Sequence, residues 1–503
     1  MDAVLTGIAT AFSVQNLAFC FLGVTLGTFI GVLPGLGGLA AVSLLLPISF
    51  YLEPTTALIM LAGVYYGGEY GGSTASILLK LPGDASNAIT CLDGHEMTRQ
   101  GRAGVALFTA AIGSFIGGST AIVLLMVLTP VLVKVALSFG PAEYFAAMTF
   151  GLLAAATIAQ GAPLKGMAMV LMGLLLGTIG TDVNSGVERY TFGFLELLDG
   201  FSVVIIGMGM FGIAEVISSV MTARDRAYKG RISISSMLPT REDVRRAALP
   251  IARGTGIGAL FGVLPGTGPT ISAFMAYVIE KRISRTPERF GRGAIEGVAA
   301  PESANNAAAQ ASFIPTLALG IPGSASMAIM LGAMMIHGIT PGPRMMIDHQ
   351  EVFWGLVISF WIGNVMLLVL NIPLINVWVR VLQVPYRFLY PAIVCVVCIG
   401  VFSINNSVFE VWLVLMFGLA GYLMRLLGFE PAPLMIGFIL GPMVEENLRR
   451  AMRLAGGDFL AILERPITAA ILGMTALLFL WIVYGIVRSK TRMVDRLDDL
   501  AQG

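Results

Sequence analysis

Three acidic residues, Glu69, Asp84 and Glu302, lie in or beside strongly apolar sequence. Carboxylates within apolar segments are costly and often mark ion or proton pathways. They can also cap the N-terminus of a broken helix, where free N–H groups favour negative charge. The sequence leaves both roles open. Glu69 and Glu302 have related positions, 82 − 69 = 13 and 322 − 302 = 20 residues before the prolines Pro82 and Pro322.

Small hydroxyl and amide side chains accompany these carboxylates in two clusters. They could bind a carboxylate or coordinate Na⁺ without placing a fixed charge inside a membrane. The same residue types also pack helices against each other in membranes, so residue type alone does not separate the roles. The residues that we predict to bind substrate are Ser73, Thr74, Ser76, Pro82, Gly83, Ser86, Asn87, Asn305, Asn306, Pro322, Gly323, Ser324 and Ser326.

Both clusters belong to a pattern that occurs twice in the chain. Residues 31–37 read GVLPGLG and residues 262–268 read GVLPGTG, whereas LPGDASNAI at 81–89 returns as IPGSASMAI at 321–329. The offsets are 262 − 31 = 231 and 321 − 81 = 240 positions. Two ordered matches at nearly the same offset indicate an internal duplication.

Each copy places Pro and Gly within apolar sequence, where they break helices. Broken helices expose backbone N–H and C=O groups, which a membrane tolerates only where they line a cavity. Half-helix N-termini favour anions, and unwound carbonyls favour small cations such as Na⁺. We therefore predict a binding site within the membrane, with the second break closest to substrate. The predicted cation-binding or hinge residues are Gly31, Pro34, Gly35, Gly37, Glu69, Asp84, Gly262, Pro265, Gly266, Thr267, Gly268, Thr270 and Glu302.

The composition is that of a membrane protein. Of 503 residues, 56% are hydrophobic and only 12% are charged, where a soluble protein would have about 25% charged residues. Apolar runs of membrane-spanning length recur along the chain. We predict an all-α polytopic membrane protein with about 11 to 13 membrane segments, in two homologous halves that form inverted repeats with broken or re-entrant helices. An elevator-like secondary transporter would fit this plan.

Basic residues suggest the domain limits and the orientation. We expect a first transmembrane repeat at 1–222, a basic linker at 223–247, a second repeat with further spans at 248–487, and a tail at 488–503. The linker and the tail carry clustered Lys and Arg, which predicts a cytoplasmic location for both. Residues 91–102 are polar and are predicted to form a loop. Basic residues flank both sides of segment 250–278, so a re-entrant segment and a single crossing both remain open.

No pattern typical of an enzyme is present in the sequence. The Gly-rich stretches lack the Gly-Lys-Ser/Thr of a P-loop, and no HExxH motif or nucleophile elbow occurs. Cys395 and Cys398 form a CxxC within apolar residues, which favours helix packing over redox or metal chemistry. The net charge of +1 gives no reason to expect a nucleic-acid partner. We predict no enzymatic activity and no cofactor, with energy supplied by an ion gradient or a partner.

The combined motifs resemble the large membrane subunit of the tripartite tricarboxylate transporters, the TctA family. The resemblance covers nearly the whole chain and rests on residues 31–38, 67–74, 81–84, 262–268, 301–306 and 320–324. It implies a multi-pass protein of the bacterial inner membrane that works with a small four-span membrane subunit and a periplasmic substrate-binding protein. It also implies uptake driven by a cation gradient, with Na⁺ as the coupling ion, and organic carboxylates such as citrate as substrates.

Two hypotheses for the activity follow. The first is import of di- or tricarboxylates coupled to a cation gradient, with substrate and ion held at the paired breaks near the middle of the bilayer. The second is a passive channel or facilitator for organic anions, built from the same broken helices.

Overall fold

Helices account for nearly all of the regular structure. The computed structural model describes residues 2–157, 163–182, 185–222, 230–265, 267–384 and 386–502. Within these ranges the only strands are β1 (Gly180–Thr181) and β2 (Glu188–Arg189), which pair antiparallel. The all-α prediction is therefore confirmed. Six of the described helices are long and apolar enough to cross a membrane: Val14–Val32, Ala103–Ala136, Val203–Val220, Gln350–Asn371, Val408–Leu426 and Pro466–Tyr484.

The chain divides into two compact units that do not follow the order of the sequence. Unit 1 comprises Met1–Ala136 and Ser202–Leu426, and unit 2 comprises Leu137–Phe201 and Leu427–Gly503. Both copies of the duplicated motif lie in unit 1.

The first half of unit 1 is built around the two predicted breaks. Its helices are α1 (Asp2–Ala11), α2 (Val14–Val32), α3 (Gly37–Ser49), α4 (Pro54–Leu79), α5 (Thr90–Arg99) and α6 (Ala103–Ala136), with a 3-10 turn at Ala85–Asn87. The first break lies between α2 and α3, where Gly35 and Gly37 have positive φ angles. The second follows α4, which ends at Lys80 in the left-handed conformation. The polar residues 91–102 were predicted to form a loop, but Thr90–Arg99 form α5, so that prediction was wrong.

Helices α2 and α4 run parallel in very close contact. A Cβ atom added to Gly23, Gly27 or Gly31 would lie 2.3 Å from the carbonyl oxygen of Met60, Val64 or Gly68, respectively. The separation is constant, since 60 − 23 = 64 − 27 = 68 − 31 = 37. Only glycine lets the two backbones approach this closely.

The second half repeats this helix pair. Its helices are α12 (Arg241–Val263), α13 (Gly268–Ile283), α14 (Glu296–Ala311), α15 (Phe313–Leu319), α16 (Ala325–Ile336) and α18 (Gln350–Asn371). A Cβ added to Gly254, Gly258 or Gly262 would lie 2.2–2.7 Å from the carbonyl oxygen of Ala300, Ala304 or Ala308. The separation is again constant, since 300 − 254 = 304 − 258 = 308 − 262 = 46. The parallel helix pair therefore occurs once in each half.

Helices α12 and α13 form a hairpin whose arms are joined by an ion pair. Arg253 donates to both carboxylate oxygens of Glu280, at 2.8 and 2.6 Å. Arg253 lies 264 − 253 = 11 residues before the turn at Leu264, which is roughly 17 Å of helix against roughly 30 Å for the hydrocarbon core. A charged pair this close to the turn fits a re-entrant segment at 250–278, which stays a prediction beside the single crossing.

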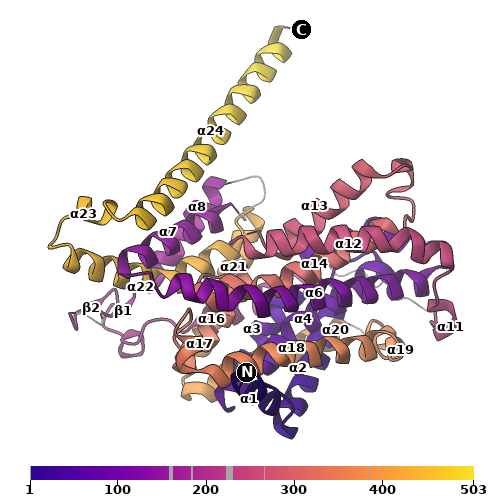
Figure 1. The fold of residues 1–503 in the computed structure, drawn as a ribbon, viewed down its shortest axis with the longest axis horizontal. Helices are drawn as coiled ribbons and strands as arrows, with labels where there is room; N and C mark the ends of the chain where they lie inside the picture. Colours follow the sequence, from indigo (N-terminus) through magenta and orange to yellow (C-terminus); the bar gives the residue numbers. More distant parts are fainter. Residues whose placement is uncertain are drawn as a thin grey trace. The chain divides into compact units, whose positions relative to one another are not determined.

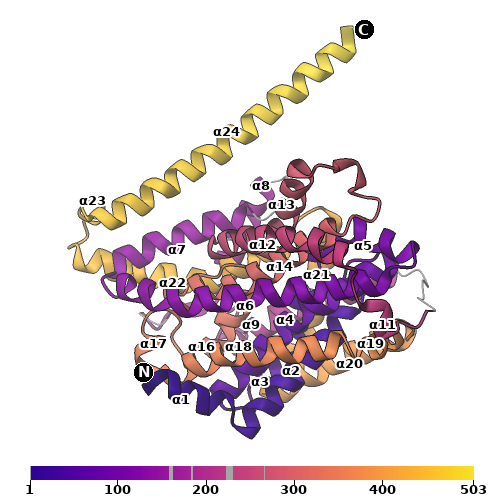
Figure 2. The same cartoon turned by 45° about the vertical axis from the view of Figure 1, so that its right-hand side comes forward.

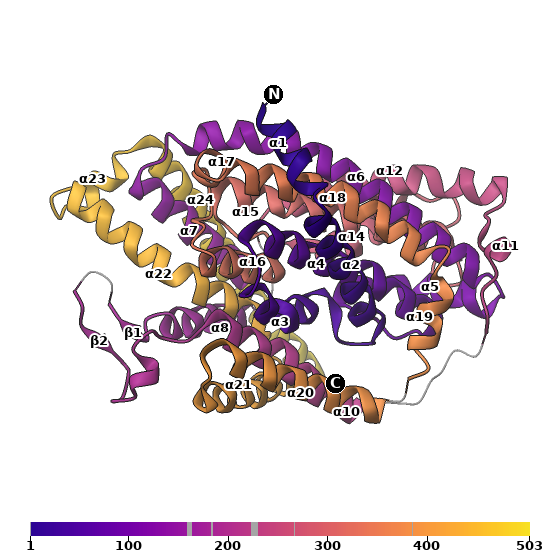
Figure 3. The same cartoon turned by 90° about the horizontal axis from the view of Figure 1, so that it is seen from below.

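Aromatic side chains form a core where the two halves of unit 1 meet. The ring of Phe313 lies 6.2 Å from that of Tyr65 and 4.7 Å from that of Phe360. These rings belong to α15, α4 and α18, so residues from both halves build one core. Helices α6, α12 and α14 lie side by side (Figures 1 and 2), and α2 and α4 lie together with α18 (Figure 3).

Shorter helices complete unit 1. They are α9 (Val203–Gly207), which continues through a π-helical turn (Met208–Ile213) into α10 (Ala214–Thr222), then α11 (Ile234–Met237), the 3-10 turn Pro287–Arg289, α17 (Met345–Asp348), α19 (Ile375–Val381), α20 (Tyr386–Asn405) and α21 (Val408–Leu426).

Unit 2 consists of helices and the two-stranded ribbon. It contains α7 (Pro141–Ala156), α8 (Pro163–Leu176), the 3-10 turn Leu195–Leu197, α22 (Pro431–Leu454), α23 (Phe459–Leu463) and α24 (Pro466–Gln502). Arg189 and Arg449 each pair with both Asp182 and Glu445, and this network fixes the ribbon to α22.

Candidate functional site

The two breaks of the first half contact each other. The backbone N–H of Gly35 donates to the carbonyl oxygen of Pro82 at 3.1 Å. The N–H of Gly38, in the first turn of α3, donates to Oδ2 of Asp84 at 2.9 Å. Asp84 therefore caps the N-terminus of α3, which is one of the two roles that the sequence left open. Its carboxylate lies where a Cβ on Gly37 would fall, at 2.5 Å, so Gly37 makes room for it.

The second half brings its two breaks together in the same way, without the carboxylate. A Cβ on Gly268, at the start of α13, would lie 3.4 Å from Cβ of Ser324. Ser324 occupies the position that Asp84 has in the first copy, and its hydroxyl accepts from the N–H of Met327 at 3.3 Å to cap α16. Gly266 lies outside the described residues.

Glu302 is the centre of a buried polar cluster. It extends from α14 between α4 and α5, and only 1% of its surface is exposed. The hydroxyl of Ser73 donates to Oε2 and that of Thr90 to Oε1, each at 2.5 Å. The amide of Asn87 lies 3.5 Å from Oε1 and 3.2 Å from the Ser73 hydroxyl. Three residues from three segments thus converge on one carboxylate.

Glu69 lies one helical turn before Ser73 on α4 and is also buried, with 3% of its surface exposed. The Ser86 hydroxyl donates to Oε2 at 2.8 Å. Oε1 is directed to the start of α3, 3.4 Å from where a Cβ on Gly38 would lie. Neither Glu69 nor Glu302 has a Lys, Arg or His partner among the described residues. A buried carboxylate without a basic partner must take a proton or a cation to be stable.

Two asparagines of α14 extend the cluster. The Asn306 amide donates to the Ser114 hydroxyl at 2.7 Å and to the carbonyl oxygen of Glu302 at 3.2 Å. Asn305 lies against Glu69, yet neither its amide nitrogen nor its oxygen has a partner in hydrogen-bonding geometry. Each unpaired buried polar atom costs about 1–3 kcal/mol. Asn305 is therefore the group in this cluster most available to a ligand.

The predicted residues fall into three groups. The structure brings together Glu69, Ser73, Asp84, Ser86, Asn87, Glu302, Asn305 and Asn306. Several others have packing or turn positions: Gly31 and Gly262 in the helix pairs, Gly83 against Gly31 and Gly72, Gly323 against Ser312, and Pro34, Pro82, Pro265 and Pro322 at the breaks.

The remaining predicted residues do not join the cluster. The Thr267 hydroxyl donates to carbonyl oxygens of its own hairpin, those of Phe261 and Leu264. Ser76 is directed to Cys91 on α5. Thr270 is half-buried on α13, and Ser326 lies buried in the first turn of α16. Thr74 lies one residue beyond Ser73 on α4 and lines a small cavity described below.

Sequence reasoning missed Thr90, Ser114 and Asp93. Thr90 follows Ser86 by four residues, so a helix through 86–90 would have placed them on one face. Asp93 accepts from the backbone N–H groups of Gly291, Gly293 and Ala294 at 2.8–2.9 Å. It also accepts from the Tyr277 hydroxyl at 2.9 Å. Asp93 thereby holds the segment that leads into α14, which carries Glu302.

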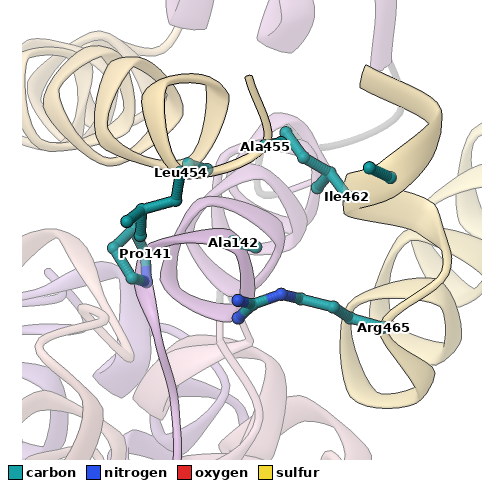
Figure 4. A pocket seen from close by; sticks show the side chains of 8 residues that line it. Pro141, Ala142, Leu454, Ala455, Ile462 and Arg465 are labelled. Carbon is teal, nitrogen blue, oxygen red and sulfur yellow. The ribbon is translucent and has the colours of Figure 1, made fainter. Parts of the chain in front are cut away.

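Unit 2 contains a cavity of a different kind. Its volume is about 160 Å³, and apolar residues of α7, α22 and α23 line it together with Arg465 (Figure 4). The Arg465 guanidinium already pairs with Glu143 at 3.2 Å. None of the predicted site residues lines this cavity, so it is not the site described above.

The polar cluster lacks the residues of a transition-metal centre. Among the residues that the structure describes, no group of three or more His, Cys, Asp or Glu side chains could hold a metal ion. Cys395 and Cys398 are free thiols. The cluster offers hydroxyl, amide and carboxylate oxygens, the ligand type that hard cations prefer.

A family model described as the tripartite tricarboxylate transporter TctA family matches residues 17–436. The chain belongs to this family. It is a membrane transporter component of the tripartite tricarboxylate transport type and crosses the membrane several times. The residues that carried the resemblance in the sequence include Ser73, Glu302 and Asn305, which lie in the buried cluster.

Two curated relatives come from Agrobacterium vitis. An uncharacterized 52.8 kDa protein in the TAR-I ttuC' 3'region is 49% identical over 468 residues, which is 93% of each chain. An uncharacterized protein in the TAR-II ttuC' 3'region is 49% identical over 242 residues, which is 48% of this TctA-family chain and all of the relative. No solved structure matches this chain.

Proposed function

We propose that this protein is the substrate-translocating subunit of a binding-protein-dependent secondary transporter. It imports di- or tricarboxylates of the citrate type and couples their uptake to a cation gradient, with Na⁺ as the coupling ion. Its partners are a small four-span membrane subunit and a periplasmic substrate-binding protein. The system operates in the bacterial inner membrane, and the basic linker and the C-terminus face the cytoplasm because cytoplasmic loops are rich in Lys and Arg.

The observation that carries this proposal is the pair of buried carboxylates without basic partners. Glu69 and Glu302 lie at the place where α3, α4, α5 and α14 meet. A carboxylate substrate entering here adds negative charge to negative charge. Two like charges about 4 Å apart repel by about 4 kcal/mol at the effective dielectric near a protein surface. Substrate binding therefore requires a cation or proton, which is the thermodynamic basis of symport.

The substrate contacts come from groups that favour anions. The Asn305 amide has donors to offer, and the start of α3 lies against Glu69 and Asp84, so free N–H groups there could attract a carboxylate. Asp84 already occupies the N-terminus of α3. A substrate carboxylate in that position would have to displace a carboxylate of the protein itself.

Transport also requires the site to open to each side in turn. We infer an elevator-like movement in which the duplicated helix pairs, each locked by glycine contacts, move as rigid bodies. The Pro-Gly breaks lie at the ends of these pairs and can absorb the change of backbone angles, as hinges do.

Uptake of labelled citrate into proteoliposomes that contain all three components tests the proposal. Accumulation should require an inward Na⁺ gradient and the binding protein. A passive facilitator would instead equilibrate substrate without accumulation and without the binding protein. Full accumulation after collapse of both the Na⁺ and the proton gradient would contradict the coupling.

A further inference from the structure

A small cavity lies next to the Glu302 cluster, between α4, α6 and α18. About 10 Å³ is available to the centre of a water-sized particle, which is room for about one water molecule or one dehydrated ion. Apolar residues of α6 form part of its wall. The oxygen-bearing residues of the wall are Tyr70, Ser73, Thr74, Ser114 and Asn371.

Two of these residues donate to partners that do not line the cavity. The Tyr70 hydroxyl donates to Oδ1 of Asn364 at 2.8 Å. The Asn371 amide nitrogen donates to the carbonyl oxygen of Leu367 at 3.0 Å. The Asn371 amide oxygen has no partner, although the residue is 96% buried. An unpaired acceptor in a polar cavity points to a missing ligand.

The hydroxyls of Ser73 and Ser114 also donate their hydrogen to another group and keep a free lone pair. The Ser73 hydroxyl donates to Oε2 of Glu302 and accepts from the Asn87 amide, which leaves one lone pair unused. The Ser114 hydroxyl donates to the carbonyl oxygen of Glu302 at 3.5 Å and accepts from the Asn306 amide at 2.7 Å, which also leaves one lone pair. The oxygens of Tyr70, Ser73, Ser114 and Asn371 therefore keep free lone pairs, and the Thr74 hydroxyl is the remaining polar group of the wall.

Free lone pairs around a cavity favour the binding of a cation. An anion would face the lone pairs of these four oxygens with only the Thr74 hydroxyl able to donate to it, and a water molecule could donate to only two of the four oxygens. A cation could use all four, and the Glu302 carboxylate, one hydrogen bond away through Ser73, supplies the opposite charge. Divalent ions such as Ca²⁺ take carboxylates as direct ligands, and the wall contains none.

We propose that this cavity is a monovalent-cation site for Na⁺, ligated by the oxygens of Tyr70, Ser73, Ser114 and Asn371 and lined by Thr74. Its role as the coupling site rests on the proposed function. The site joins α4 and α6 of the first half to α18 of the second. Through Ser73 and Glu302, it connects the ion directly with the cluster that holds Asn305.

The test is a Na⁺ titration of the thermal unfolding temperature of the purified protein, with choline replacing Na⁺ at constant ionic strength and no substrate present. Asn371→Leu and Tyr70→Phe each remove one ligand oxygen, and the second preserves the ring if the first does not fold. Thr109→Val on α6 is the matched control, because Thr109 is buried outside the cavity. Loss of even a supporting group at a metal site costs about 10- to 100-fold in affinity.

We expect Na⁺ to stabilise the wild type and the control at the same concentration. Asn371→Leu and Tyr70→Phe should each need at least about tenfold more Na⁺ for the same shift. Equal titrations for all four proteins, or no effect of Na⁺ on the wild type, would overturn the site, since a water molecule would then suffice. If the titrations shift as expected but uptake proves independent of Na⁺, the site stands and the proposed coupling fails.

Discussion

Replacing Glu302 by Gln should separate two contributions to the free energy of unfolding, the cost of burying a charge and the stabilisation by its hydrogen bonds. The substitution preserves shape and leaves an acceptor for one of the two hydroxyls at 2.5 Å, those of Ser73 and Thr90. Hydrogen bonds to a charged group are worth about 1.5–3 kcal/mol and neutral ones about 0.5–1.5 kcal/mol, so weakening one bond and losing the other costs about 2.5–4.5 kcal/mol. Burying a charge without a basic partner costs several kcal/mol.

The cost of burying the charge is at least as large as this loss, so the substitution should not destabilise the protein, which is unusual in a core. In Na⁺-free buffer at neutral pH, Glu302→Gln should unfold at the same temperature as the wild type or a higher one. The reason is that a neutral amide resembles the protonated carboxyl that the wild type needs when no cation is bound. Adding Na⁺ should stabilise the wild type and leave the variant nearly unchanged. Uptake by the variant should fall at least about 100-fold, because its cation site has lost the charge that balances the ion.

The assay is thermal unfolding of both proteins across a Na⁺ series, with Glu296→Gln as the matched control. Glu296 lies on the same helix, but Arg246 donates to both of its carboxylate oxygens at 2.8 Å. The control should therefore lose stability with or without Na⁺ and should still respond to Na⁺. The reasoning is refuted if Glu302→Gln is several kcal/mol less stable than the wild type without Na⁺, or if it keeps the full Na⁺ response.

Three further substitutions test other parts of the structure. Gly258→Ala places a Cβ 2.2 Å from the Ala304 carbonyl oxygen and should lower the free energy of unfolding by about 1–3 kcal/mol. Gly256→Ala on the same helix meets no atom within 4 Å and should be neutral or stabilising. Equal effects of the two substitutions would show that close helix packing does not require Gly258. Asp93→Asn weakens the acceptor for three backbone N–H groups and should speed amide hydrogen exchange at residues 291–294. Unchanged exchange would show that Asp93 does not hold this segment. Asn305→Ala should reduce uptake at least about tenfold without lowering thermal stability, since it removes two unpaired buried polar atoms; normal uptake would exclude Asn305 from the substrate site.

The sequence was sufficient to locate the breaks and most of the polar cluster. Pro and Gly within apolar sequence have a strong local effect on the backbone, so the ends of α2, α4 and α12 fall where the duplicated motifs predict them. The rarity of acidic residues in apolar segments singled out Glu69 and Glu302. Those two signals depend on a residue and its near neighbours, which is why one sequence reveals them.

The partners of these residues could not be predicted, because they come from distant parts of the chain. Ser73 and Thr90 reach Glu302 over 229 and 212 positions, and no local pattern links them. Thr90 was also hidden by the polar composition of α5, which resembles a loop. Asn371 ends an apolar helix with no motif around it, and only the packing of α18 against α4 and α6 gives it a role. The sequence could not tell whether Asp84 caps a helix or binds an ion, and the hydrogen bond from the Gly38 N–H to Asp84 identifies it as the cap of α3.

The most direct measurement of the central claim is a structure of the protein in a lipid nanodisc with Na⁺ and citrate added. We expect substrate density against Asn305 and between the breaks, and ion density between Ser73, Ser114 and Asn371 beside Glu302. Substrate density elsewhere, such as in the cavity that Arg465 lines in unit 2, would contradict the account even if uptake itself depended on Na⁺.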